Sequence, residues 1–290
     1  MTVPLRDSAP AELGDVEREL DAVVIGAGFA GLYMLHRLRG SGLATAVLEA
    51  GDGVGGTWYW NRYPGARCDS ESYYYSYSFS EQLQQDWVWT ERYPEQPEIL
   101  RYLNHVADRF DLRRDIRFGR RVVEAAFDER ANRWRLRTDA GERWSARFLV
   151  TAVGCLSSAN IPRIPGLDTF GGDWYHTGRW PGDGVDLTGK RVGVVGTGST
   201  GIQAIPVIAE QAAHLTVFQR TVKADYPTIR RAQRESTNGH PFPISPTSAL
   251  QVPAQRRQQV YEAAWAVGGL RFRAAFQDLL TSKEANDTAS

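Results

Sequence analysis

Residues 21–32 read DAVVIGAGFAGL, and this stretch indicates the fold class. Its first half is a short apolar, β-branched run, which is typical of a buried strand. The run leads directly into G-x-G-x-x-G, formed by Gly26, Gly28 and Gly31, and leucines then recur at helical spacing. Gly26 permits a tight turn, Gly28 lets the backbone approach a pyrophosphate, and Gly31 lets helix and strand pack closely. The order of strand, glycine turn and helix therefore predicts a dinucleotide-binding unit.

An acidic residue follows the second strand of this unit. The apolar run over 44–48 predicts that strand, and Glu49 follows it, about 20 residues beyond the glycines. A carboxylate there can accept a hydrogen bond from a ribose 2′-hydroxyl, and it would repel a 2′-phosphate. Our hypothesis is that the first unit binds FAD.

A second unit of the same kind spans residues 191–218. It contains a strand, the glycine turn GTGSTG over 196–201, a helix and a closing strand. Arg220 stands where an acid would favour NAD, and a guanidinium suits a 2′-phosphate. Thr221 can add a hydroxyl group. We therefore expect NADPH on the second unit.

The composition excludes several other classes of protein. The chain has 290 residues and a net charge of zero, which gives no indication of a nucleic-acid or membrane-surface partner. Cys68 and Cys155 stand far apart, with no disulfide framework or metal-binding spacing, so we expect no metal and a cytoplasmic location. Residues 1–20 lack the basic-then-apolar order of a signal peptide, and no apolar run is long enough to span a membrane, so we expect neither feature.

The expected fold is α/β, with two Rossmann-like dinucleotide-binding units, a β-meander insertion over 122–153 and a C-terminal helical segment. The expected divisions are a mobile leader over 1–20, an FAD-binding domain over 21–160, an NADP-binding domain over 161–222 and a truncated helical segment over 223–290. Residues 97–110 predict a helix with one apolar stripe, and the alternating Tyr73, Tyr75 and Tyr77 predict a strand. The glycine- and aromatic-rich residues 51–69 predict a functional loop without regular structure.

Two further motifs lie between the glycine turns. Residues 170–181 read FGGDWYHTGRWP and fit F-x-G-x-x-x-H-x-x-x-W-P at every fixed position. Residues 55–69 read GGTWYWNRYPGARCD and fit G-G-x-W-x-x-x-x-Y-P-G-x-x-x-D. Through these motifs, the chain from about residue 20 to residue 285 resembles the type I Baeyer–Villiger monooxygenases.

The resemblance implies an FAD- and NADPH-dependent enzyme that inserts one oxygen atom of dioxygen beside a ketone carbonyl to give an ester or lactone. It implies that Arg67 and Asp69 lie at the reacting centre, and that His176 is a structural linker residue. The implied FAD contacts are Phe29, Glu49, Thr57, Trp58, Tyr59, Trp60, Asp69, Tyr75 and Val122. The implied NADP contacts are Thr197, Gly198, Ser199, Thr200, Gly201, Gln203, Arg220 and Thr221.

The chain departs from this family at its end. Members continue well past this length and carry their active-site arginine in the later part, so we expect a C-terminally truncated fragment that does not turn over ketones alone. One alternative is a related flavin monooxygenase that oxygenates nitrogen or sulfur. The other is a truncated non-catalytic nucleotide-binding protein, or one subunit of a split enzyme that pairs with a complementing subunit.

Overall fold

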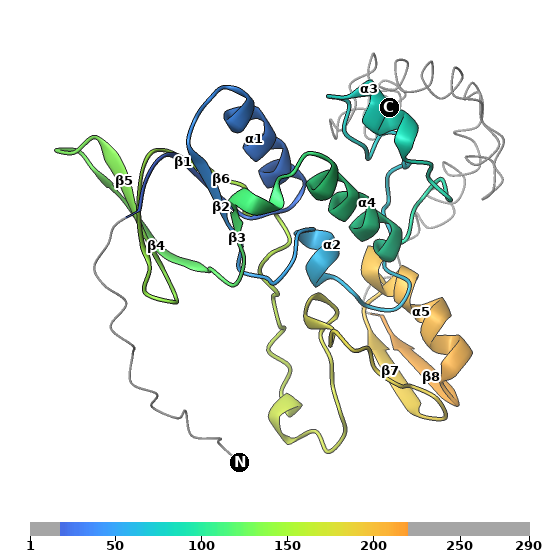
Figure 1. Ribbon diagram of the computed structural model, residues 1–290. Coiled ribbons are helices and arrows are strands. Elements are labelled where there is room, and N and C mark those ends of the chain that lie inside the picture. The colour runs from blue at the N-terminus through green and yellow to red at the C-terminus, as the bar shows by residue number, and fades with distance from the viewer. Residues whose placement is uncertain (1–17, 220–290) are drawn as a thin grey trace, which may run out of the picture. The chain divides into compact units, whose positions relative to one another are not determined.

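The computed structural model describes residues 18–219, which form two units (Figure 1). Unit one comprises residues 18–60 and 103–162, and unit two comprises residues 61–102 and 163–219. The predicted helical segment over 223–290 lies outside the described residues.

Unit one is built on a six-stranded sheet in the order β3-β2-β1-β6-β5-β4. Its strands are β1 (Arg18–Ile25), β2 (Thr45–Leu48), β3 (Ile116–Arg117), β4 (Val122–Asp128), β5 (Arg133–Thr138) and β6 (Arg143–Thr151). β1 pairs in parallel with β2 and β6, and β2 pairs in parallel with β3. β4, β5 and β6 pair antiparallel in sequence order. This confirms the expected α/β class and the predicted β-meander, whose last strand returns to the centre of the sheet.

The helix α1 (Phe29–Gly40) covers the parallel part of this sheet (Figure 1). Leu32 and Leu35 on α1 and Val23 and Val24 on β1 are fully buried. Consecutive buried residues on β1 show that both faces of the strand are covered, as in other parallel sheets. The apolar packing of these residues thus holds α1 against the sheet.

The first strand starts earlier than predicted. β1 begins at Arg18, inside the segment 1–20 that was expected to be a mobile leader. Arg18 pairs with Trp144 on β6, and its guanidinium lies 4.9 Å from the centre of the Trp144 ring. A cation over an aromatic face is a favourable contact, and this pairing across more than 120 positions of sequence has no local signal.

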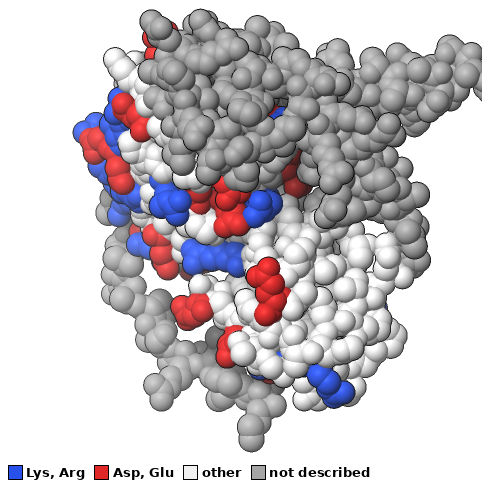
Figure 2. Space-filling view, turned by 90° about the vertical axis from the view of Figure 1, so that its right-hand side faces the viewer, with Lys and Arg blue, Asp and Glu red and all other residues white. Residues whose placement is uncertain are grey.

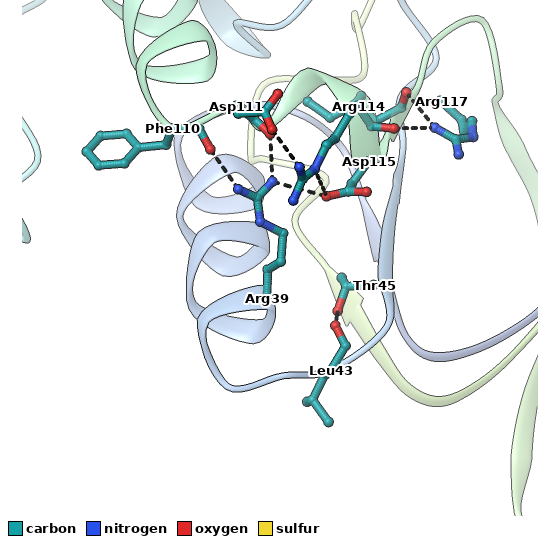
Figure 3. A network of polar contacts seen from close by, with 9 residues as sticks. Arg39, Leu43, Thr45, Phe110, Asp111, Arg114, Asp115 and Arg117 are labelled. Atoms are coloured by element: carbon teal, nitrogen blue, oxygen red, sulfur yellow. Dashed lines mark hydrogen bonds and ion pairs between the residues drawn. The ribbon is translucent and has the colours of Figure 1, made fainter.

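An arginine fixes the far end of α1. The Arg39 guanidinium donates to the carboxylate of Asp115 at 3.1 Å and to the backbone oxygens of Asp111 and Phe110 at 2.6 and 2.8 Å (Figure 3). Asp111 has a φ of 49°, a left-handed conformation that aspartate tolerates better than most residues. These bonds tie the C-terminal end of α1 to the turn that precedes β3.

The remaining elements are α2 (Thr57–Trp60), α3 (Glu81–Asp86), α4 (Gln96–Arg109), β7 (Arg191–Val195), α5 (Ser199–Gln211) and β8 (His214–Phe218). Three 3₁₀ turns occupy Arg113–Asp115, Leu167–Thr169 and Thr177–Arg179. In unit two, β7 and β8 pair in parallel beside α5. α4 confirms the helix predicted over 97–110, with Ile99, Leu103 and Val106 buried.

Two local predictions are wrong. The tyrosine-rich segment is a turn, because the N–H of Tyr75 bonds back to the oxygens of Glu71 and Ser72 at 3.0 and 3.1 Å. Tyr77 is buried against Tyr102, so the alternation reflects burial within a turn. The loop over 51–69 also contains regular structure, since α2 forms one helical turn. Its N–H groups donate hydrogen bonds to the backbone oxygens of Gly55 and Gly56.

The described surface carries both signs of charge. On the face in Figure 2, basic and acidic side chains lie among one another where residues are described. No helix within residues 18–219 is long and apolar enough to cross a membrane. The same residues contain no group of three or more histidine, cysteine, aspartate or glutamate side chains suited to a metal ion.

Candidate functional site

The first glycine turn lies between β1 and α1 in unit one. Gly26 has a φ of 100°, and a Cβ there would lie 2.6 Å from the oxygen of Ala152. A Cβ on Gly31 would lie 1.8 Å from the oxygen of Gly26. Gly28 is the N-cap of α1, and no side chain caps the helix. Such a helix start presents backbone N–H donors and the positive end of the helix dipole, so this turn fits a phosphate group.

A second pair of glycines packs on this turn. The N–H of Gly55 donates to the oxygen of Ala27 at 3.0 Å, and a Cβ on Gly56 would lie 2.8 Å from the Cα of Gly28. Gly56 also has a φ of 53°. The backbone of the predicted functional loop therefore rests directly on the dinucleotide turn, a contact that the sequence analysis did not predict.

Glu49 links the same two segments. Its side chain is buried, and its two carboxylate oxygens accept hydrogen bonds from the N–H groups of Ala27 and Gly51, each at 2.7 Å. Each carboxylate oxygen has a further acceptor position. The acid that was predicted from its spacing thus also organises the turn, which sequence reasoning missed.

The aromatic residues of α2 differ in exposure. Trp58 is buried, whereas Trp60 is 44% exposed and meets the ring of Tyr59 edge-on at 4.9 Å between centroids. Tyr59 packs against Gly51, where a Cβ would lie 2.7 Å from its ring. Among the other predicted FAD contacts, Phe29 opens α1, Thr57 opens α2 and Val122 opens β4 in unit one, while Asp69 and Tyr75 belong to unit two.

The second glycine turn, between β7 and α5 in unit two, repeats the geometry of the first. Gly196 has a φ of 102°, and a Cβ on Gly201 would lie 2.4 Å from the oxygen of Gly196. Gly198 is the N-cap of α5 without a side-chain cap, and a Cβ on it would meet nothing within 4 Å. Thr197, Ser199 and Thr200 complete the turn. This turn therefore also fits a phosphate group.

The Gln203 side chain of α5 is hydrogen-bonded to a loop of unit two. The Oε1 of Gln203 accepts hydrogen bonds from the Tyr63 hydroxyl at 2.8 Å and from the N–H of Arg67 at 3.2 Å. Its Nε2 donates to the oxygen of Arg67 at 3.1 Å and to the carboxylate of Asp69 at 2.8 Å. The loop over 63–69 is thus held against the helix that follows the second turn.

The two predicted catalytic side chains of this loop have different partners. The Arg67 guanidinium pairs with the carboxylates of Glu91 at 3.4 Å and Glu95 at 2.6 Å. Loss of solvation at the Asp69 carboxyl raises its pKa, and the hydrogen bond from Gln203 acts in the opposite direction. Sequence reasoning missed both glutamates, which carry no motif.

Two further groups of unit two are structural. Burial raises the pKa of the Cys68 thiol to about 12, so the thiol remains protonated and is a poor nucleophile. The Nδ1 of His176 accepts a hydrogen bond from the N–H of Gly178 at 3.1 Å and caps a 3₁₀ turn. This bond is consistent with the structural part that the resemblance implies for His176.

The chain is similar to proteins of known function. The family model for pyridine nucleotide-disulphide oxidoreductases matches residues 23–230. The chain is 46% identical to a phenazine N-monooxygenase of Lysobacter antibioticus and 44% identical to a Baeyer–Villiger monooxygenase of Pseudooceanicola batsensis. These alignments cover 93% and 95% of this chain and 54% of each relative, so the chain spans about half their length. A solved structure of oxidised steroid monooxygenase bound to NADP is 56% identical, with a TM-score of 0.71, covering 93% of this chain and 55% of that one.

Proposed function

Because the chain belongs to the pyridine nucleotide-disulphide oxidoreductase family, we propose that it acts as an FAD- and NADPH-dependent monooxygenase of the Baeyer–Villiger type. The reaction consumes a ketone, dioxygen, NADPH and a proton, and it yields an ester or lactone, NADP⁺ and water. The observation that carries the proposal is the repeated turn, in which two uncapped helix starts follow glycines of the same geometry. Similarity to a Baeyer–Villiger monooxygenase supports the choice of reaction.

The residues present fit two nucleotide cofactors. The start of α1 would hold the FAD pyrophosphate, and Glu49 would use its remaining acceptor positions for a ribose hydroxyl. The start of α5 would hold the NADP pyrophosphate, and Arg220 and Thr221, which lie outside the described residues, would bind the 2′-phosphate. FAD, when bound, supplies the electron transfer from NADPH to dioxygen.

The cofactors would divide between the domains as the sequence predicts, with FAD on residues 21–160 and NADP on residues 161–222. Residues 61–102 lie within this expected FAD domain, but the contacts within the chain group them with unit two, so the loop that carries Arg67 and Asp69 packs on the unit proposed to hold NADP. We place the protein in the reducing cytoplasm, because the described cysteines, Cys68 and Cys155, are both free thiols.

Oxygenation of nitrogen is the second candidate function. It is supported by similarity to a phenazine N-monooxygenase at 46% identity. The motif ending in Trp180 and Pro181 favours ketones, because the resemblance to Baeyer–Villiger enzymes depends on it. Product analysis with a ketone and with a heteroaromatic amine separates the two reactions.

The direct test is the visible absorption spectrum of the purified chain after incubation with FAD and gel filtration. We expect retained yellow flavin that bleaches on addition of NADPH without air and recovers when air is admitted. Retained flavin that NADPH does not bleach would contradict the assignment of the second turn. Failure to retain flavin would contradict the assignment of the first.

The cofactor preference has its own test in Arg220→Ala. Loss of the guanidinium should weaken NADPH binding by about 1.5–3 kcal/mol, as for other hydrogen bonds to charged groups. Binding of NADH, which lacks the 2′-phosphate, should stay unchanged, and fluorescence titration measures both. Equal NADPH affinity in the variant and the wild type would show that Arg220 does not read the phosphate.

A further inference from the structure

We propose that Gln203 is a positioning residue, which holds the carboxylate of Asp69 in one orientation and joins its loop to the start of α5. This inference rests on the proposed function, because the resemblance to Baeyer–Villiger monooxygenases implies that Asp69 lies at the reacting centre. It differs from the expectation that Gln203 contacts NADP directly.

The amide of Gln203 is fully used by the loop. Oε1 accepts two hydrogen bonds, from Tyr63 and the Arg67 N–H, and Nε2 donates two, to the Arg67 oxygen and the Asp69 carboxylate. An amide side chain has two donor hydrogens and two acceptor lone pairs, so no position is left over. A nucleotide could bond to this amide only by displacing one of these partners.

The loop also packs closely against α5. Gly65 has a φ of 74°, and a Cβ there would lie 2.3 Å from the backbone oxygen of Gln203. Tyr63 packs against the buried cluster of Leu187, Ala204 and Ile208, of which the last two belong to α5. The four hydrogen bonds of the Gln203 amide thus lie beside an apolar contact between the loop and α5. Together these contacts fix the position of the loop on the helix.

The charges around Asp69 make the amide its important partner. The Arg67 guanidinium is occupied by Glu91 and Glu95, so it does not serve as the counter-ion of the neighbouring acid. The titratable groups that face Asp69 are Tyr63 and Cys68; burial raises the pKa of each, and the charge of Asp69 raises it further. The Nε2 donor of Gln203 is therefore the group that favours the ionised carboxylate.

The test is the titration of Asp69 in the 290-residue chain, labelled with ¹³C at the aspartate carboxyl carbons and assigned with Asp69→Asn. Gln203→Met keeps the length of the side chain and removes the donor. Because the donor favours the charged form, we expect the pKa of Asp69 to rise in this variant. Gln211→Met, at the exposed end of the same helix, is the matched control and should leave the titration unchanged.

An Asp69 pKa that is unchanged or lower in folded Gln203→Met would overturn the proposal. If this variant does not fold, the wild-type chain supplies the measurement, since the side-chain amide proton resonances of Gln203 should shift with the titration of Asp69. Amide resonances that do not follow Asp69 would equally overturn it. No nucleotide is present in either titration, so failure of the proposed function would leave this result intact.

Discussion

Gly31→Ala is expected to abolish FAD retention and to lower the free energy of unfolding by about 3–5 kcal/mol, at the upper end of single substitutions. The added Cβ would lie 1.8 Å from the oxygen of Gly26. Gly26 cannot yield, because its N–H bonds to the oxygen of Leu48 at 2.9 Å and its own Cβ position is filled by the oxygen of Ala152. The start of α1 would therefore be displaced from the strand, and the phosphate-binding N–H groups would move with it.

Urea unfolding and flavin absorbance after gel filtration measure the two effects. The control is Gly40→Ala at the other end of α1, where a Cβ would meet nothing within 4 Å. This substitution should be neutral or stabilising by up to about 1 kcal/mol, because alanine has the higher helix propensity. Equal stability and equal flavin content in the two variants would refute close packing as the reason for Gly31.

Gly65→Ala should destabilise unit two by about 2–4 kcal/mol and weaken NADP⁺ binding at least about tenfold. Its Cβ would lie 2.3 Å from the oxygen of Gln203 and 3.0 Å from Val207, at a φ of 74°. The loop over 63–69 would have to leave α5, which would break the hydrogen bonds of the Gln203 amide and disturb the second glycine turn.

Gly184→Ala separates the two causes of this effect. Gly184 has a φ of 80°, yet a Cβ there would meet nothing within 4 Å. The free energy of unfolding of this variant should fall by only about 1–2 kcal/mol, which is the cost of a left-handed conformation for a residue with a Cβ. Thermal unfolding with and without NADP⁺ compares the variants. If Gly65→Ala costs no more than Gly184→Ala, collision with α5 is not the reason for the glycine.

Features that depend on residues a few positions apart could be predicted from the sequence. The spacing of the glycines at both turns follows from the approach of a helix to its own preceding strand, which lies within about five residues. The apolar stripe of α4 likewise follows from helical periodicity. The tyrosine-rich segment shows the limit, because a turn that buries Tyr73 and Tyr77 produces the same alternation as a strand.

The α/β class, the two glycine turns and the β-meander therefore follow from local order, because each depends on residues close together along the chain. Glu49 follows from its spacing within one strand–helix–strand unit. The role of Gln203 emerged only from the folded chain, since its partner Tyr63 lies 140 positions away. The same holds for the contact of Gly56 with Gly28 and for the pairing of Arg18 with Trp144. A single glutamine or glycine forms no sequence pattern that indicates a distant partner. These contacts therefore depend on how the strands and loops pack in the folded chain.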